Sequence, residues 1–211
     1  MQKILDSKVI AIVRGHSGGE IMQIAEALLA GGVRCMEITY NAANPESDNA
    51  TANIVKQLND SYGDSMQIGS GTVLTERQVE LTYAAGGKFI ISPNVNPAVI
   101  RRTKALGMVS IPGAYSPSEC EEAHEAGADF IKLFPAAHLG VGYLKAIMAP
   151  LLHIKFMVVG GITAENVLAY IKAGAVGVGT GSDLIIKDAV SKGDFARITE
   201  RAKTYVRAVS L

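Results

Sequence analysis

The chain has little cysteine and no excess charge of either sign, and both shortages exclude classes of protein. It has two cysteines, Cys35 and Cys120, which show no CxxC spacing. We interpret them as reduced thiols of a cytoplasmic protein, because a disulfide framework needs more cysteines. The formal net charge is zero, which argues against a nucleic-acid-binding surface.

Membrane, export and metal-ligand signals are also missing. No apolar run approaches the roughly 20 residues that a membrane span needs. The first residues lack a basic segment followed by an apolar one, so we expect no export. The four histidines are scattered without HxH or HExxH spacing, so we expect no metal site.

What is present is a regular alternation of short apolar runs with amphipathic stretches. It predicts parallel strands joined by right-handed crossovers and closed into one (β/α)8 TIM barrel over residues 1–211. An open doubly wound sheet is the alternative, but it seldom uses eight such even units. The expected strands are Lys8–Arg14, Cys35–Tyr40, Met66–Thr72, Lys88–Pro93, Met108–Pro112, Phe130–Phe134, Phe156–Gly160 and Ala175–Gly179.

The helix starts carry recognisable capping sequences. Ser116 is followed by a proline and, at the third helical position, by a glutamate; the run from Thr75 to Gln78 repeats the pattern with glutamine. We expect Met1–Asp6 and the Asp194–Val209 helix to cap the barrel. The other predicted helices include Gly19–Ala30, Thr75–Ala85, Ala98–Leu106, Pro117–Ala126 and Ala164–Ala173.

Two charged residues stand inside apolar strands. Lys132 lies in the run Phe130–Phe134, and Glu37 lies between Met36 and Ile38. Burial lowers the pKa of a lysine and frees its lone pair for Schiff-base formation with a carbonyl. A structural ion pair is the alternative, but two buried charges cost nearly as much desolvation as they return. The pattern therefore favours an amine nucleophile beside a carboxylate general acid/base.

The remaining candidates lie where strands end, because barrel active sites form at the carboxyl ends of the strands. Gly160-Gly161 and Gly181-Ser182 follow the last two strands, where many barrels hold phosphate on backbone N–H groups at a helix N-terminus. Ordinary tight turns are the alternative. Thr72 and Arg14 are candidates for holding an anionic group. The alternatives are that Thr72 only begins a loop and that Arg14 forms an ion pair on the surface.

Several segments of the chain, taken in their order along the sequence, resemble the keto-hydroxyglutarate/keto-deoxy-phosphogluconate aldolase family. The resemblance covers nearly the full chain and rests on the segments Ile12–Gly15, Glu37–Thr39, Gly69–Val73, Ile91–Asn94, Ile111–Gly113, Ile131–Ala136 and Gly160–Ile162. It implies a class I, metal-free aldolase without a cofactor, usually trimeric. It also implies that Lys132 forms the Schiff base and that Glu37 is the acid/base. Arg14, Thr72, Gly160, Gly161, Gly181 and Ser182 match the family's substrate-binding positions.

The sequence departs from part of the family at two positions. Asn41 stands where many members carry an arginine for the pyruvate carboxylate, and Val159 stands where some carry threonine. Both residues, and the run Gly181–Leu184, look similar to the 6-phosphogalactonate branch. The segment Asn44–Asn49 is unusually polar and is expected to reshape the mouth of the barrel.

The expected reaction is reversible cleavage of 2-keto-3-deoxy-6-phosphogluconate, or its galactonate epimer, to pyruvate and glyceraldehyde 3-phosphate. The unphosphorylated 4-hydroxy-2-oxoglutarate is a further candidate substrate. A sugar-phosphate epimerase is the alternative enzyme, but it would want a metal or a second acid/base. A non-catalytic phospho-sugar sensor is a third possibility, against which the Lys132 and Glu37 pair argues.

Overall fold

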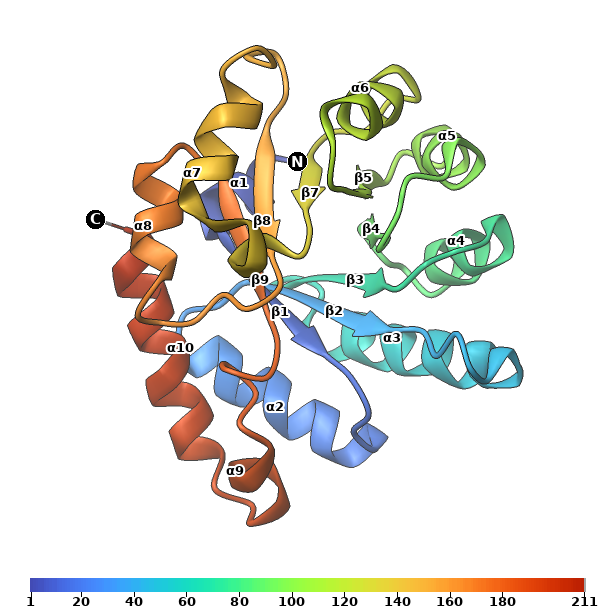
Figure 1. The fold of residues 1–211 in the computed structure, drawn as a ribbon. Helices are drawn as coiled ribbons and strands as arrows, with labels where there is room; N and C mark the ends of the chain where they lie inside the picture. Colours follow the sequence, from blue (N-terminus) through green and yellow to red (C-terminus); the bar gives the residue numbers. More distant parts are fainter. Residues whose placement is uncertain (211) are drawn as a thin grey trace.

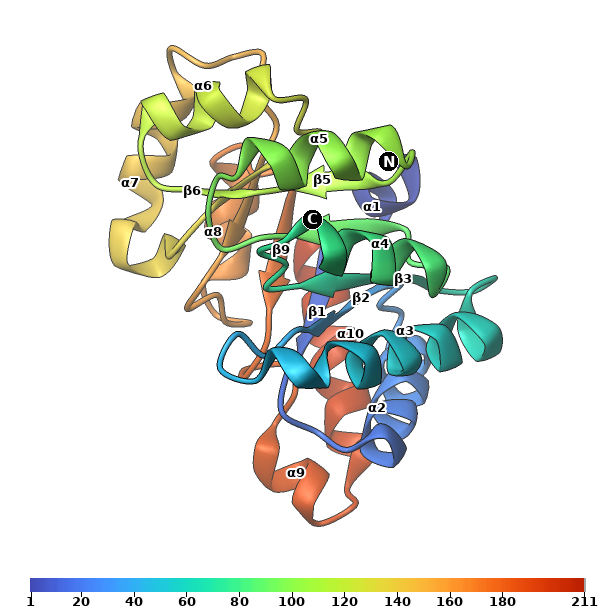
Figure 2. The ribbon, with the colours of Figure 1, turned by 90° about the vertical axis from the view of Figure 1, so that its right-hand side faces the viewer.

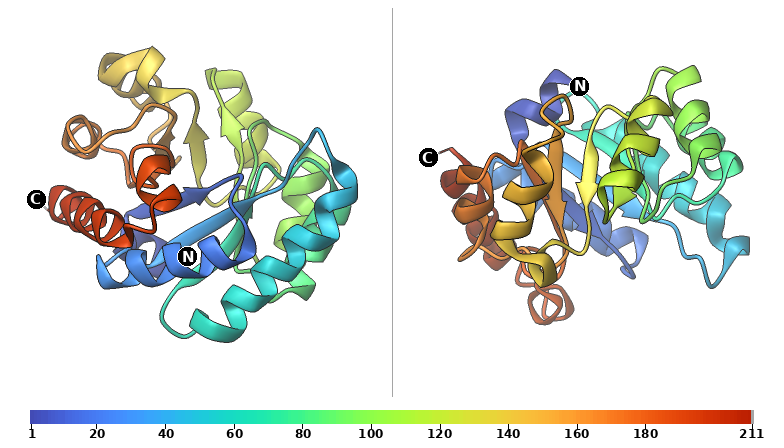
Figure 3. Two further views of the ribbon diagram at one scale, coloured as in Figure 1. Left: turned by 90° about the horizontal axis from the view of Figure 1, so that it is seen from below. Right: turned by 45° about the horizontal axis from the view of Figure 1, so that its top comes forward.

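The computed structural model describes residues 1–210, in which parallel strands form a barrel surrounded by helices (Figures 1 and 3). The strand order is β5-β4-β3-β2-β1-β9-β8-β7-β6. This arrangement confirms the predicted (β/α)8 barrel. The strands are β1 Val9–Val13, β2 Cys35–Thr39, β3 Gln67–Gly71, β4 Phe89–Ile91, β5 Val109–Ile111, β6 Gly113–Ala114, β7 Ile131–Leu133, β8 Phe156–Val159 and β9 Gly177–Thr180.

The barrel closes through one strand that is interrupted at Pro112. β5 pairs with β4 and β6 pairs with β7, and Pro112 alone separates the two pieces. Proline has no N–H to donate to a ladder, so the strand breaks there. The Pro112 carbonyl still accepts a hydrogen bond from the Lys132 N–H at 2.9 Å. The nine strand segments therefore correspond to the eight predicted strands.

The helices form the outer layer, and α3, α4, α5 and α6 follow one another around one side (Figure 2). They are α1 Gln2–Ser7, α2 Gly18–Ala30, α3 Asp48–Tyr62, α4 Glu76–Ala84, α5 Pro97–Ala105, α6 Pro117–Glu125, α7 Ala136–Met148, α8 Val167–Lys172, α9 Lys187–Ser191 and α10 Phe195–Val209, with a short 3-10 turn at Pro45–Ser47. Within residues 1–210, no helix combines the length and the apolar content needed to cross a bilayer.

Side chains alternate between the barrel interior and the helical layer, as the pleat requires. The apolar interior has residues from five of the strands, joined by Phe130 just before β7 and by Ile4 of α1: Ile4, Ile10, Cys35, Phe89, Ile91, Val109, Ile111, Phe130 and Met157. Glu37 and Lys132 stand two residues further along the strand face that carries Cys35 and Phe130. The apolar layer therefore forms the floor beneath the two charged groups.

Several predicted elements differ from the structure. The Asp194–Val209 helix does not cap the barrel: α10 packs against α2 and α8 in the outer ring, so this expectation was wrong. The last strand begins at Gly177 rather than Ala175, and α8 begins at Val167 because residues 164–166 form a turn. Both predicted capping boxes, at Thr75 and Ser116, are confirmed.

The packing of α2 against α10 yields a test at Gly31. A Cβ at Gly31 would overlap the Ala202 Cβ and lie 2.8 Å from the Thr199 carbonyl oxygen. We predict that Gly31→Ala lowers the free energy of unfolding by about 1–3 kcal/mol, the usual cost of overpacking. Gly19→Ala is the control, because a Cβ there meets no atom within 4 Å. Urea denaturation of both variants checks this, and equal stability would contradict the close α2–α10 contact.

Candidate active site

A cavity of about 630 Å³ opens at the carboxyl ends of the strands, and it contains all eight predicted site residues. Its lining includes Arg14, Glu37, Thr72, Lys132, Gly160, Gly161, Gly181 and Ser182. The structure therefore brings these residues together from loops and strands spread over most of the chain. The local geometry indicates what each of these residues can do chemically.

Lys132 projects from β7 into the cavity and is 7% exposed. Its Nζ lies 4.7 Å from the centre of the Phe134 ring. Burial lowers the pKa of Lys132; the nearby Glu37 partly opposes this effect, and the Arg14 charge adds to it. A lowered pKa increases the fraction of neutral amine, which is the nucleophilic form.

Glu37 of β2 is 2% exposed and faces the same cavity. Burial raises the pKa of its carboxyl group from 4.5 to about 7, although the Lys132 and Arg14 charges act in the opposite direction. Its Oε2 atom is buried and has no hydrogen-bond partner within residues 1–210. A carboxyl group with this pKa can both release and accept a proton near neutral pH.

Lys132 and Glu37 influence each other electrostatically, but no hydrogen bond or ion pair joins them. Gly71 of β3 makes room for the carboxylate, because a Cβ at this position would overlap it. Buried polar atoms normally have a hydrogen-bond partner. A substrate or a water molecule would therefore be expected to donate a hydrogen bond to the unpartnered Oε2 atom of Glu37. The arrangement suits proton transfer better than a closed structural ion pair.

Arg14 is held over the cavity by two threonines. Its Nε donates to Thr39 Oγ1 at 3.3 Å, and its Nη2 donates to Thr72 Oγ1 at 3.1 Å. Thr72 has a φ of 56°, a left-handed conformation that is rare for a β-branched residue. Such a backbone costs on the order of 1–3 kcal/mol and is concentrated at functional sites. The guanidinium is thus positioned for an anionic group in the cavity.

Two turns line the cavity after the last two strands, Gly160-Gly161 and Gly181-Ser182, which we call the glycine corners. The N–H groups of Gly161, Gly181 and Ser182 donate to no acceptor within residues 1–210. Gly160 and Gly161 have φ values of 93° and 71°, which favour glycine. The expected helix N-termini are not at these corners, because α8 and α9 begin several residues later. An anion here would be bound by loop N–H groups.

Some residues near the mouth differ from expectation. Asn41 and the segment Asn44–Asn49 do not line the cavity, and the Asn41 side chain accepts a hydrogen bond from the Ala43 N–H instead. Val159 does line it. Sequence reasoning missed His16, Thr163 and Lys187, which also lie on the wall. His16 and Thr163 lie in loops that follow strands, and Lys187 begins α9; these positions were the available signal.

The cysteines lie away from the cavity. Cys35 is in the barrel interior and Cys120 is in the outer layer, both buried and neither in a disulfide. Burial raises the pKa of the Cys35 thiol to about 11. In the part of the chain that the structure describes, no three histidine, cysteine or acidic side chains come together as metal ligands.

Comparison with known proteins agrees with this geometry. A family model described as KDPG and KHG aldolase matches residues 1–201. The chain belongs to this aldolase family. The 2-dehydro-3-deoxy-6-phosphogalactonate aldolase of Escherichia coli strain K12 is 39% identical over 177 residues, which cover 83% of each chain.

Solved structures of the aldolase family superpose closely. The "Native KDPGal structure" has a TM-score of 0.85 and 35% identity, covering 96% of this chain and 94% of its own. The KDPG aldolase from Legionella pneumophila, with pyruvate captured as a covalent carbinolamine intermediate, has a TM-score of 0.82 and 30% identity, covering 94% of each chain. The barrel and its family are therefore those that the sequence predicted.

The raised pKa of Glu37 predicts a pH-dependent effect on stability. The folded barrel favours the protonated carboxyl, so this contribution is complete below pH 4.5 and is lost as the pH rises to about 7. We predict that Glu37→Gln raises the melting temperature relative to the unmodified chain at about pH 8 and changes it less at about pH 5. Thermal unfolding at both pH values checks this. A less stable variant at the higher pH would show that Lys132 and Arg14 stabilise the ionised carboxylate.

Proposed function

We propose that this chain is a class I aldolase that cleaves a 2-keto-3-deoxy-6-phospho-sugar acid through a Schiff base on Lys132. The observation that carries the proposal is a buried lysine in a substrate-sized cavity, with a lowered pKa and no ion-pair partner within residues 1–210. The Legionella relative, whose structure holds a covalent carbinolamine of pyruvate, supports this chemistry.

Lys132 performs the covalent steps. Its neutral amine attacks the C2 ketone and forms a carbinolamine, which loses water to give an iminium. The iminium draws electrons from the C3–C4 bond as that bond breaks. The products at this stage are glyceraldehyde 3-phosphate and an enamine of pyruvate. Protonation of the enamine at C3, followed by hydrolysis, releases pyruvate and restores the amine.

Glu37 moves the protons. Its protonated form, acting through a water, helps hydroxide leave the carbinolamine, and its ionised form accepts the proton of the C4 hydroxyl as the C3–C4 bond breaks. One carboxyl group can serve both steps because its pKa lies near 7. The missing direct contact with Lys132 leaves room for the substrate or the water between them.

The other cavity residues bind the two anionic ends of the substrate. Arg14 and Thr72 lie on the side of Glu37 and would orient the carboxylate, whereas Asn41 takes no part because it faces its own loop. The N–H groups of Gly161, Gly181 and Ser182, with Gly160 shaping the turn, would bind the phosphate. This division keeps the C2 ketone next to Lys132.

Val159 on the cavity wall and the similarity to the Escherichia coli relative favour the galactonate epimer as substrate. Cleavage rates of the gluconate and galactonate phospho-acids, measured side by side, test this choice, and faster gluconate cleavage contradicts it. The family resemblance also supports cleavage of 4-hydroxy-2-oxoglutarate. The resemblance further supports a cytoplasmic homotrimer, and residues 1–211 would form one aldolase domain in each subunit. Analytical ultracentrifugation tests the trimer, and a mass that corresponds to another oligomeric state would contradict it.

An epimerase has less support. It would want a second free acid/base in the cavity, and Asp183 is the other carboxylate on the wall. Asp183 forms an ion pair with Arg201 at 2.5 Å, and the net effect of its surroundings is to lower its pKa. A carboxylate that is held ionised in this way is a poor proton donor near neutral pH.

We predict that pyruvate and borohydride label Lys132 covalently. The buried amine forms an imine that borohydride reduces to a stable secondary amine, and peptide mapping by mass spectrometry locates it. Lys132→Arg is expected to abolish the label, because guanidinium stays protonated. Lys187→Gln is the control, since Lys187 also lines the cavity but is exposed. A label on another lysine, or none in active protein, would refute the assignment.

We predict that Gly181→Ala impairs phosphorylated substrates selectively. Within the protein, a Cβ at Gly181 meets only ordinary contacts, the nearest being the Ile12 carbonyl oxygen at 3.4 Å. The new methyl group therefore obstructs the phosphate without distorting the fold. We expect KM for the phospho-acid to rise about tenfold or more, equivalent to roughly 1.4 kcal/mol, with a much smaller effect on 4-hydroxy-2-oxoglutarate. Equal effects on both substrates would contradict the phosphate site.

A further inference from the structure

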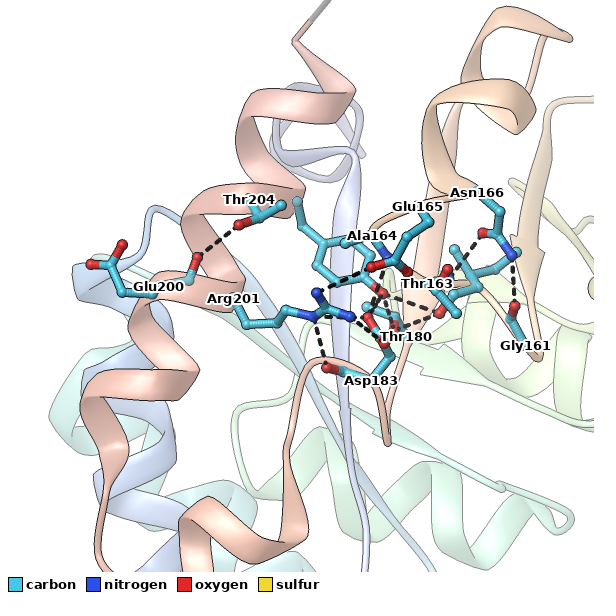
Figure 4. A network of polar contacts seen from close by, with 12 residues as sticks. Gly161, Thr163, Ala164, Glu165, Asn166, Thr180, Asp183, Glu200, Arg201 and Thr204 are labelled. Atoms are coloured by element: carbon cyan, nitrogen blue, oxygen red, sulfur yellow. Dashed lines mark hydrogen bonds and ion pairs between the residues drawn. The ribbon is translucent and has the colours of Figure 1, made fainter.

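Behind the glycine corners, a cluster of polar side chains connects the loop after β8 to the loop after β9. Its members are Asp183 of the second loop together with Arg201 and Tyr205 of α10, and we call it the Asp183 cluster. Figure 4 shows Arg201 reaching from α10 toward Asp183, beside the Thr163–Asn166 segment of the first loop. The sequence pattern gave no indication of this connection.

Asp183 accepts hydrogen bonds from two parts of the chain, the loop after β8 and helix α10. Its Oδ2 atom accepts from the Ala164 N–H at 3.2 Å, from Arg201 Nε at 3.1 Å and from the Tyr205 hydroxyl at 2.6 Å. Arg201 Nη2 donates to Oδ1, and Arg201 Nε also lies 3.3 Å from the Asp183 carbonyl oxygen. The Ala164 contact joins the two loops directly, and the others attach both to α10.

Tyr205 lies close to the other loop, at Ile162. It is fully buried, and its hydroxyl lies 3.1 Å from both the Ile162 carbonyl oxygen and Thr180 Oγ1. A hydroxyl has one proton to donate, and the shortest contact assigns it to Asp183. Thr180 Oγ1 can then donate to the Ile162 carbonyl at 3.1 Å. Ile162 directly follows Gly161, and Thr180 directly precedes Gly181, so the network ends beside both corners.

Charge gives the cluster a second effect on the cavity. Burial acts to raise the pKa of Asp183, but the hydrogen bonds from Arg201 and Tyr205 outweigh it and hold the group as a carboxylate. An unbalanced carboxylate on the cavity wall would repel a phosphate. The Arg201 guanidinium, which also lies 3.4 Å from Glu165, balances that charge from behind the wall.

We propose that Asp183, Arg201 and Tyr205 are positioning residues for the phosphate. They fix the spacing between the two loops whose N–H groups would bind it, and Arg201 offsets the charge of the Asp183 carboxylate on the cavity wall. This inference rests on the proposed function, because it assigns the phosphate of that substrate to these loops. No hydrogen bond or ion pair joins any of the three residues to Lys132 or Glu37.

Kinetics with two substrates test the positioning role. Tyr205→Phe removes one hydroxyl and keeps the buried ring, and Arg201→Gln removes the balancing charge. For both variants we expect KM for the phospho-acid to rise about tenfold with kcat nearly unchanged, and no comparable change with 4-hydroxy-2-oxoglutarate. Arg201→Lys is expected to keep the charge but not the two-point contact. Its KM for the phospho-acid should therefore lie between those of the unmodified chain and of Arg201→Gln. Arg102→Gln, which breaks the Glu80 ion pair on the outer helices, is the control.

Binding of inorganic phosphate, followed by ³¹P NMR, separates this inference from the proposed function. Weaker phosphate binding by Tyr205→Phe and Arg201→Gln than by the unmodified chain supports the positioning role, even if the chain fails to cleave the phospho-acid. Unchanged phosphate affinity in both variants overturns it, as does no phosphate binding by the unmodified chain. Equal losses with both keto-acid substrates, accompanied by lower melting temperatures, also overturn it, because the cluster would then only stabilise the fold.

Discussion

The site depends on the burial of two ionisable groups inside a barrel whose remaining interior is apolar. Lys132 and Glu37 are both more than nine-tenths buried, yet neither hydrogen bond nor ion pair joins them. Burial has the largest effect on each group: it lowers the lysine pKa and raises the glutamate pKa. The charge of the other group opposes each shift only in part. A direct ion pair would oppose both shifts and hold both groups in their charged forms. The separation leaves the amine without an ion-pair partner and the carboxyl with a pKa of about 7, as the proposed roles of nucleophile and acid/base require.

The surrounding structure maintains that separation. Gly71 leaves space for the Glu37 carboxylate, and the apolar floor below excludes polar partners from one side. Thr72, in its left-handed conformation, holds Arg14 at the mouth. These features lower stability locally, through a strained residue and an unpartnered buried oxygen. The same features leave the binding groups free for a substrate.

Much of the site could be predicted because barrel strands carry a strong local signal. A charge between apolar strand neighbours, as at Lys132 and Glu37, indicates burial without any knowledge of distant contacts. The order of strands then places Arg14, Thr72 and the two glycine corners at one end of the barrel. The shared cavity confirms that placement.

The errors arose from local loop contacts as well as from distant parts of the chain. Asn41 lies near Glu37 in sequence, but its side chain bonds to its own loop. The final helix looked like a cap because its pattern reveals an apolar face but not the neighbours that cover it. Asp183 and Tyr205 meet only through the fold, so neither stood out in the sequence as part of one network. Local patterns locate buried charges well but do not identify their long-range partners.

The most direct test of the central claim is a crystal structure of the protein soaked with pyruvate. We expect continuous electron density from Lys132 Nζ to the pyruvate C2 atom, with the Glu37 carboxylate facing the adduct and Arg14 or Thr72 contacting the pyruvate carboxylate. Pyruvate held without a covalent bond, or bonded to a different lysine, would contradict the claim that burial makes Lys132 the nucleophile.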